Sequence, residues 1–172
     1  MKIYPGRIPQ IAIELASTLI AEKAIEVDAS ELGEFHLDLE AVLKSYLETE
    51  RRIHEEAQEL ISKRGLEYTT YGRLKHELAK KYNFSLGDEA IDWLTDQFIE
   101  ILYHTSHVEE VWADNNEIRK IMRPILQKHT SLDDELDAEV RKKIKNLKEG
   151  TVAWDVKYHQ ILEDVKRRKG LK

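Results

Sequence analysis

The stretch IHEEAQELI at residues 53–61 sets the pattern of this chain, and LDAEVRKKI at residues 136–144 repeats it. Each stretch carries an apolar or small side chain at every fourth position, namely Ile53, Ala57 and Ile61 in the first and Leu136, Val140 and Ile144 in the second. Side chains four residues apart lie on one face of an α-helix, whereas a strand requires strict alternation. Both stretches therefore predict amphipathic helices with charged outer faces.

Helical periodicity continues through nearly all of the chain. It predicts helices over residues 8–20, 36–47, 48–64, 70–82, 91–102, 114–126, 132–147 and 152–165. Asp114, Ser131 and Thr151 are expected to cap helix N-termini, and Gly65 is expected to end a helix. Pro124 is expected to kink or break its helix. No window shows the sustained alternation of a strand, so the sequence predicts an all-α fold.

The chain also repeats itself on a larger scale. AIEV at residues 24–27 is echoed 84 residues later by VEEV at 108–111. Each half begins with an acid-rich segment and places its Lys and Arg residues afterwards; residues 83–117, for example, contain nine Asp and Glu and no Lys or Arg. We therefore expect a tandem duplication that forms an elongated helical assembly, with helix pairs projecting from a shared core. The expected repeats cover residues 1–84 and 85–172.

Composition and charge limit the possible functions. The 172 residues are 41% hydrophobic and 35% charged, enough to fill the core of one domain or of two small halves. A net charge of −6 disfavours general binding to polyanions, so a nucleic-acid contact requires a local basic face. The absence of cysteine excludes disulfides, thiolate zinc sites and thiol catalysis. The heavy use of Glu and Lys resembles a heat-adapted composition.

The apolar stretches are too short and too interrupted to predict a membrane span. The longest, IAIELASTLIA at residues 11–21, contains Glu14 and lacks the flanking pattern of a signal peptide. We therefore expect a cytoplasmic protein without a membrane partner.

Several strings are more specific than a helical pattern. They are IPQIAIELA (8–16), DLEAVLKSYLETERRI (38–53), GRLKHELAKKYNFSLGDEAIDWLTDQ (72–97), HTSHVEEVWADNNEIRKIM (104–122) and ELDAEVRKKIKNLKEGTVAWDVKY (135–158). In these strings the chain resembles the bacterial family called "domain of unknown function 507", over nearly its whole length. The resemblance implies a small bacterial helical protein, and it transfers no reaction or catalytic residue to this chain.

Basic residues near the ends of the last two predicted helices form one candidate binding face. They are Arg141, Lys142, Lys145, Lys148, Arg167 and Arg168. On one helix, Arg141, Lys145 and Lys148 share a stripe that can contact phosphates without reading the base sequence. The alternative is a solvated surface, because the helix dipole favours cations at a C-terminus and acids such as Asp137 before it.

Acidic residues form a second candidate face, which consists of Glu109, Glu110, Asp114 and Glu117. Such a face is either solvated or complementary to a basic protein partner, including another copy of the chain. Trp112 lies in the same segment. Like Trp93 and Trp154, it is expected to anchor the core.

No pattern for chemistry stands out from the sequence. Glu100, His104 and His107 have helical i, i+4, i+7 spacing, yet on a straight helix they span about 10 Å, too far for one metal ion. The chain contains no Glu-x-x-His pair, nucleophile elbow, GxGxxG motif or P-loop. We therefore predict no metal, no cofactor and no catalytic residue.

The sequence thus favours a non-catalytic binding or scaffolding protein that meets protein partners, or copies of itself, through charged helix faces. Nucleic-acid binding by the basic helix ends of the second half is the alternative. One continuous positive patch would favour that alternative, whereas basic residues neutralised by neighbouring acids would count against it.

Overall fold

The computed structural model describes residues 2–144, 147 and 151–171, with the backbone alone at residues 88, 133, 134 and 155. Its elements are α1 (Ile8–Ala21), β1 (Ile25–Glu26), α2 (Leu32–Arg64), α3 (Tyr71–Lys81), α4 (Ala90–His104), β2 (Glu110–Val111), α5 (Asn115–Thr130), α6 (Leu132–Lys143) and α7 (Val152–Arg168). Short 3-10 turns precede α1, α3 and α4. The all-α prediction is confirmed, apart from a pair of two-residue strands. None of the helices in these described ranges has the length and apolar character to cross a membrane.

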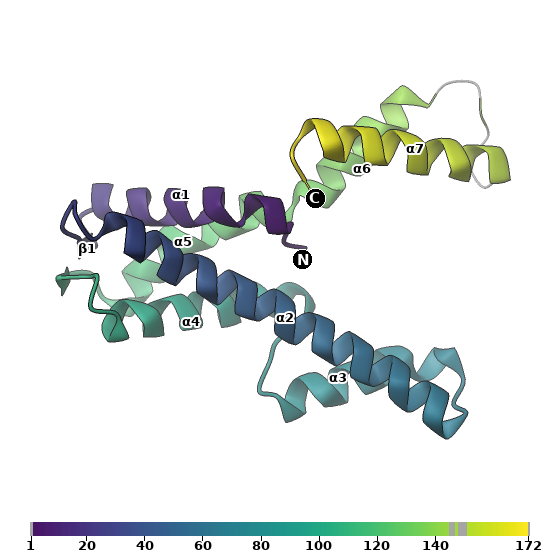
Figure 1. Ribbon diagram of the computed structural model, residues 1–172, viewed down its shortest axis with the longest axis horizontal. Helices are drawn as coiled ribbons and strands as arrows, with labels where there is room; N and C mark the ends of the chain where they lie inside the picture. The colour runs from purple at the N-terminus through teal and green to yellow at the C-terminus, as the bar shows by residue number, and fades with distance from the viewer. Residues whose placement is uncertain (1, 145–146, 148–150, 172) are drawn as a thin grey trace.

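The molecule consists of a helical body with two projecting arms (Figure 1). The body contains α1, the N-terminal half of α2, α4 and α5. The first arm pairs the C-terminal half of α2 with α3, and the second arm pairs α6 with α7. This arrangement agrees with the expected helix pairs around a shared core.

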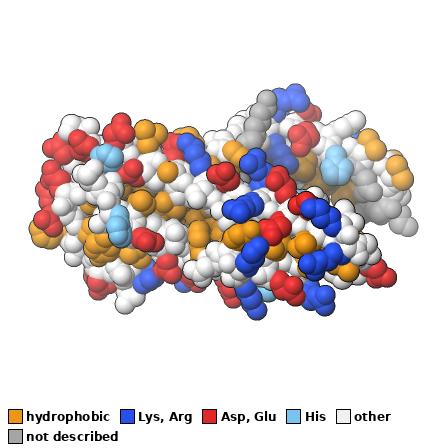
Figure 2. Space-filling model, turned by 60° about the horizontal axis from the view of Figure 1, so that its bottom comes forward, with side chains coloured by type: hydrophobic (Ala, Val, Ile, Leu, Met, Phe, Trp, Pro, Cys, Tyr) orange, Lys and Arg blue, Asp and Glu red, His pale blue; other side chains and the backbone are white. Residues whose placement is uncertain are grey.

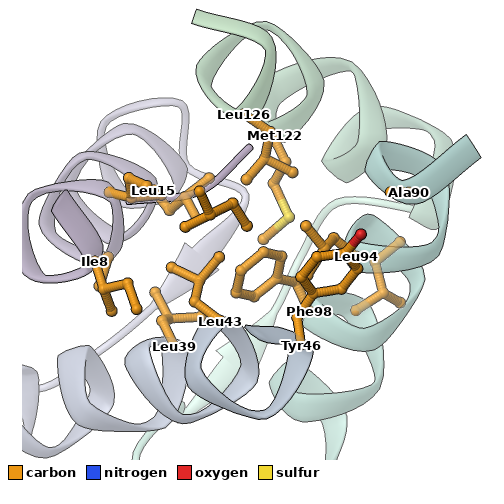
Figure 3. Packing of buried hydrophobic residues seen from close by; sticks show 14 of the residues in the cluster. Ile8, Leu15, Leu39, Leu43, Tyr46, Ala90, Leu94, Phe98, Met122 and Leu126 are labelled. Carbon is orange, nitrogen blue, oxygen red and sulfur yellow. The ribbon is translucent and has the colours of Figure 1, made fainter. Parts of the chain in front are cut away.

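The core of the body is built from both halves of the chain (Figure 3). Its buried side chains include Ile8, Leu15, Leu39, Leu43, Tyr46, Ala90, Leu94, Phe98, Met122 and Leu126. Full burial of each large apolar side chain contributes about 1.5–3 kcal/mol relative to exposure, so packing of the two halves against each other stabilises the body. The second arm has a smaller cluster of its own, formed by Leu132, Leu136, Val140, Val165 and Leu171 with Tyr4.

The long helix α2 joins the body to the first arm without interruption, although the sequence indicated two consecutive segments. It ends as predicted at Gly65, whose φ of 59° lies in the left-handed region that glycine adopts without strain.

Helix α5 continues through Pro124 to Thr130, so the expected break does not occur at this residue, and the expected kink stays a prediction. Pro124 is exposed, so water can satisfy the carbonyl group that the proline ring leaves without a donor. The break falls at Ser131 instead. Ser131 precedes α6 as predicted, but its hydroxyl donates to the carbonyl of Lys128 at 3.2 Å rather than capping α6.

The two strands connect the halves of the chain. They pair antiparallel, with Ile25 opposite Val111 and Glu26 opposite Glu110. These residues belong to the echoed strings AIEV and VEEV. Each half also has the same order of elements, a helix, a short strand, a long helical segment and a final helix, with α5 and α6 in the place of α2. A duplication produces this order, and duplication with a boundary at residue 84 stays a prediction.

Candidate functional site: the acidic end and the α2/α4 groove

Carboxylates crowd the end of the body that carries the strands, which we call the acidic end. Its members are Glu22, Glu26, Asp28, Glu31, Glu34, Glu109, Glu110, Asp114 and Glu117. Residues 22–34 and 109–117 contain these nine acids and a single cation, Lys23. Figure 2 shows Asp and Glu side chains concentrated at one end of the molecule, whereas Lys and Arg side chains are frequent on the other half. Strand pairing thus brings two acid-rich segments together from distant parts of the chain.

Two of the four predicted acidic residues have a structural role. Asp114 caps α5 as predicted, because its carboxylate accepts hydrogen bonds from the backbone N–H groups of Asn116 at 2.8 Å and Glu117 at 2.9 Å. The Glu117 carboxylate accepts in turn from the Asp114 N–H at 3.0 Å, which completes a capping box. Helix capping therefore accounts for the carboxylates of Asp114 and Glu117, and no partner protein is needed to explain them.

Capping and helix dipoles do not explain Glu26, Glu109 and Glu110. Glu26 and Glu110 face each other across the strand pair, where like charges destabilise the pairing. Within the described residues, none of these three carboxylates forms an ion pair. The acidic end therefore keeps a surplus of exposed negative charge that lowers the stability of the strand pair.

Four basic side chains of the body form ion pairs away from the acidic end, whereas Lys23 and Lys120 lie at that end. Arg119 binds Asp96 at 2.6 Å and Arg123 binds Asp92 at 3.1 Å, which holds α5 to α4. Lys128 and His129 bind Glu14, at 2.8 and 2.7 Å, which holds α5 to α1. Burial alone would raise the pKa of Glu14, but the hydrogen bonds from Lys128 and His129 lower it. These cations tie the body together and leave the acidic end unneutralised.

Trp112 corrects the expectation of a core anchor, because its side chain is 65% exposed. Its backbone N–H donates to the carbonyl of Ala24 at 2.8 Å. Val111 packs against the core, and the following side chain of an extended segment faces the other way. A hollow of about 490 Å³ beside the indole is lined by Glu22, Glu117 and Lys120, among others. The exposed aromatic ring thus shares this hollow with two carboxylates and two lysines, Lys23 and Lys120.

A groove of about 390 Å³ runs between α2 and α4 on the same body. Its lining from α2 comprises Asp38, Ala41, Val42 and Ser45, and its lining from α4 comprises Trp93, Gln97, Glu100, Ile101 and His104. Both sets follow helical spacing, so each is one stripe along its helix. In the view of Figure 2, hydrophobic side chains gather beside the acidic end. The groove has an apolar floor and a polar rim, as ligand sites commonly do.

One end of the groove is held by a polar contact that the sequence did not reveal. His107 Nδ1 donates to Asp38 Oδ2 at 2.7 Å, Thr105 Oγ1 donates to the same carboxylate oxygen, and the His107 N–H donates to Thr105 Oγ1 at 3.1 Å. The hydrogen bond to Asp38 raises the pKa of His107 above its usual value. Asp38 and His107 are 69 residues apart, and no local pattern links them.

The helical spacing expected for Glu100, His104 and His107 is not realised. Helix α4 ends at His104, so His107 lies in the following loop. His104 Nδ1 lies 2.7 Å from the carbonyl oxygen of Glu100, one turn earlier in the same helix. No group of three metal-ligating side chains occurs among the residues that the structure describes.

The opposite end of the groove rests on an aromatic cluster. The indole N–H of Trp93 donates to the carbonyl of Asn83 at 2.9 Å. The rings of Tyr46 and Phe84 stack with centroids 4.7 Å apart, and Trp93 meets Phe84 edge-on at 5.0 Å. Trp93 thus packs on the core as expected, while one side of it lines the groove. Both ends of the groove are fixed by contacts within the protein.

Two of the basic candidate residues, Arg141 and Arg167, are paired with acids of their own arm, whereas Arg168 contacts a backbone carbonyl. Arg141 Nε donates to Asp137 at 2.7 Å, and its guanidinium lies 5.3 Å from the centre of the Trp154 ring. Arg167 lies 3.9 Å from Asp164, whose carbonyl oxygen accepts from Arg168 Nε at 3.4 Å.

Neighbouring cations of the second arm are paired in the same way. Lys143 and Lys169 share Glu139, at 2.6 and 3.0 Å, and their hydrogen bonds lower the pKa of Glu139 to about 2. The second arm thus carries part of its positive charge in ion pairs.

The structure places Arg141 apart from Arg167 and Arg168, although Lys143 and Lys169 meet at Glu139. Arg141 contacts Trp154 near the start of α7, whereas Arg167 and Arg168 lie at its end, about 20 Å away by the rise of a helix. Of the predicted stripe of Arg141, Lys145 and Lys148, the structure describes Arg141 alone, on α6, which ends at Lys143. Lys142 is exposed on α6, and Lys145 and Lys148 lie outside the described residues.

Comparison with known proteins places the chain in a family. It matches the family described as "Protein of unknown function (DUF507)" over residues 1–171. No curated protein matches it. Because the match covers nearly the whole sequence, the resemblance seen in the quoted strings is confirmed, and this chain belongs to the DUF507 family.

Proposed function

We propose that this protein is a non-catalytic binding or scaffolding protein that meets a basic protein partner through its acidic end. One observation carries the proposal. Several basic side chains of the second arm, among them Arg141 and Lys143, are paired with neighbouring acids, whereas Glu26, Glu109 and Glu110 form no ion pair within the described residues. Uncompensated charge of one sign attracts and orients a partner of the other sign.

Trp112 adds an anchor to this charged surface. Binding energy at protein interfaces concentrates on a few residues, and Trp and Arg are frequent among them. An exposed indole beside carboxylates can receive a Lys or Arg side chain on its face while the acids pair with neighbouring cations. The proposal therefore identifies Trp112, Glu109 and Glu110 as the centre of the interface.

The proposal is tested with a fluorescein-labelled Lys-rich peptide whose anisotropy is titrated with protein at low and moderate salt. The variant carrying both Glu109→Lys and Glu110→Lys is expected to bind at least about tenfold more weakly, which corresponds to about 1.4 kcal/mol. The matched control carries Glu163→Lys and Asp164→Lys on α7, and it changes the net charge equally. Equal weakening in both variants would mean that the peptide senses overall charge and not this surface.

Nucleic-acid binding predicts a different result in the same assay. Labelled single- and double-stranded oligonucleotides are expected not to bind, because the net charge is −6 and several described cations of the second arm are paired with acids. Micromolar binding that falls steeply with salt and is lost after reversal of Arg141, Lys145 and Lys148 would overturn the proposal. Sedimentation velocity of the unmodified protein tests whether the basic partner is a second copy of this chain.

A further inference from the structure

We propose that the α2/α4 groove docks a helix of a partner protein, one that presents an apolar strip flanked by Lys or Arg. This inference rests on the proposed function, since it specifies the fold and composition of the segment that the basic partner would supply. Helix-in-groove recognition is a recurring mode in which an amphipathic helix lays its apolar face into a hydrophobic channel.

The dimensions of the groove fit a short helix. Its wall on α4 extends from Trp93 to His104, about 16 Å by the rise of a helix, so it accommodates about three helical turns. Val42, Ile101 and the small side chain of Ala41 leave an apolar floor between the two helices. Leu37, one turn before Ala41, is 52% exposed and extends the apolar surface beyond the rim. A partner helix would cover side chains that now face water.

The negative charge of the groove favours a partner helix with cationic side chains on either side of its apolar strip. Asp38 and Glu100 contribute carboxylates to its walls, and no Lys or Arg belongs to the described lining. Lys44, the nearest cation along α2, is paired with Glu40 at 2.8 Å. At one end His107, which lies 3.8 Å from Glu31, connects the groove with the acidic end. Cationic flanks on the docked helix would therefore meet negative charge along the groove and beyond it.

The groove needs little rearrangement before binding. The hydrogen bond between Asp38 and His107 fixes one end, and the stacked rings around Trp93 fix the other. A preformed site avoids the entropy that ordering on binding would cost. The contacts that hold the groove open also explain why its walls are polar at the rim and apolar at the floor.

The test uses a labelled helical peptide of about 14 residues, with Leu on one face and Lys on the other. A peptide with Glu in place of Lys and a scrambled Leu/Lys peptide serve as comparators. Ala41→Arg puts a large side chain into the groove, and Ser17→Arg adds the same charge at an exposed position on α1. Circular dichroism checks that both variants keep their helix content and melting temperature.

We expect the Leu/Lys helix to bind, with Ala41→Arg weakening it at least about tenfold and Ser17→Arg less than about threefold. Saturation is expected to shift the indole NMR signal of Trp93. The groove proposal would be wrong if the two Arg variants weakened binding equally or if the Glu or scrambled peptide bound as well as the Leu/Lys helix. It would also be wrong if the Leu/Lys helix did not bind. The Lys-rich peptide and the Glu109/Glu110 variant test the acidic end separately, so either proposal can fail while the other stands.

Discussion

Replacing Glu110 with Lys should stabilise the protein while it weakens binding of a basic partner. The substitution converts the pair of like charges between Glu26 and Glu110 into an attractive cross-strand pair. Most surface substitutions alter stability little, so a clear gain at this position requires a specific cause. A gain in stability together with a loss of binding would show that charge repulsion is maintained here for function.

The size of the effect follows from the strand register. A cross-strand pair of opposite charges contributes about 0.2–1 kcal/mol, and like charges are destabilising by a similar amount. Exchange of one for the other is therefore worth about 1 kcal/mol at low salt. For a chain of 172 residues this gain raises the melting temperature by about 2–4 °C. In 1 M salt the screening length falls to about 3 Å, so most of the gain should disappear.

The assay is thermal unfolding followed by circular dichroism at low and high salt, with three variants in parallel. Glu110→Gln removes one charge and should give about half of the gain. Glu109→Lys makes the same charge change on a side chain that faces away from Glu26, so its gain should be smaller. A melting temperature of Glu110→Lys at or below that of the unmodified protein at low salt would refute the reasoning.

Three further predictions concern single contacts. The hydrogen bond to Asp38 raises the pKa of His107, so the stability that this contact contributes is complete below about pH 6.5 and is lost as pH rises through the folded-state pKa. His107→Asn should therefore lower the urea midpoint at pH 5.5 far more than at pH 9. Asp38→Asn should lower the pKa of His107 measured by NMR titration. Asp114→Ala should reduce stability in urea by about 0.5–2 kcal/mol, whereas Asp114→Asn keeps the cap and should stay near the unmodified protein; if Asp114→Asn is equally destabilised, the capping role is wrong. Pro124→Ala should raise the free energy of unfolding by about 1–3 kcal/mol, because α5 already runs through this position although proline has no backbone N–H to donate. A lower free energy of unfolding would show that the proline ring packs favourably.

The sequence predicted the parts of the fold that depend on local spacing. Apolar residues at helical intervals identify the faces that meet in the body, so Leu39, Leu43 and Phe98 are buried as the pattern requires. Gly65 and Asp114 also act as predicted, because helix ends have requirements that single residue types meet. The short strands were missed, since two residues show no periodicity, although their strings were noticed as an echo.

The candidate site was predictable only in part for a physical reason. The acid-rich segments are visible in the chain, but their meeting at one end depends on pairing between residues 84 and 86 positions apart. Trp112 looks like a core residue until the direction of β2 is known. The contact between His107 and Asp38 is wholly tertiary. The neutralisation of Arg141 by Asp137 was the one feature of the basic residues that i, i+4 spacing already contained.

The continuity of α2 gives the molecule a mechanical lever. Residues 48–64 extend about 25 Å beyond the body as part of the same helix, so a tilt of about 5° at the groove moves the tip of the first arm by about 2 Å. The second arm is joined differently, because helix α5 stops at Ser131 before α6 begins. If a bound ligand moves α2 relative to α4, this displacement would therefore reach the first arm and hardly the second. The two arms, although similar in build, would then respond differently to a ligand bound at the body.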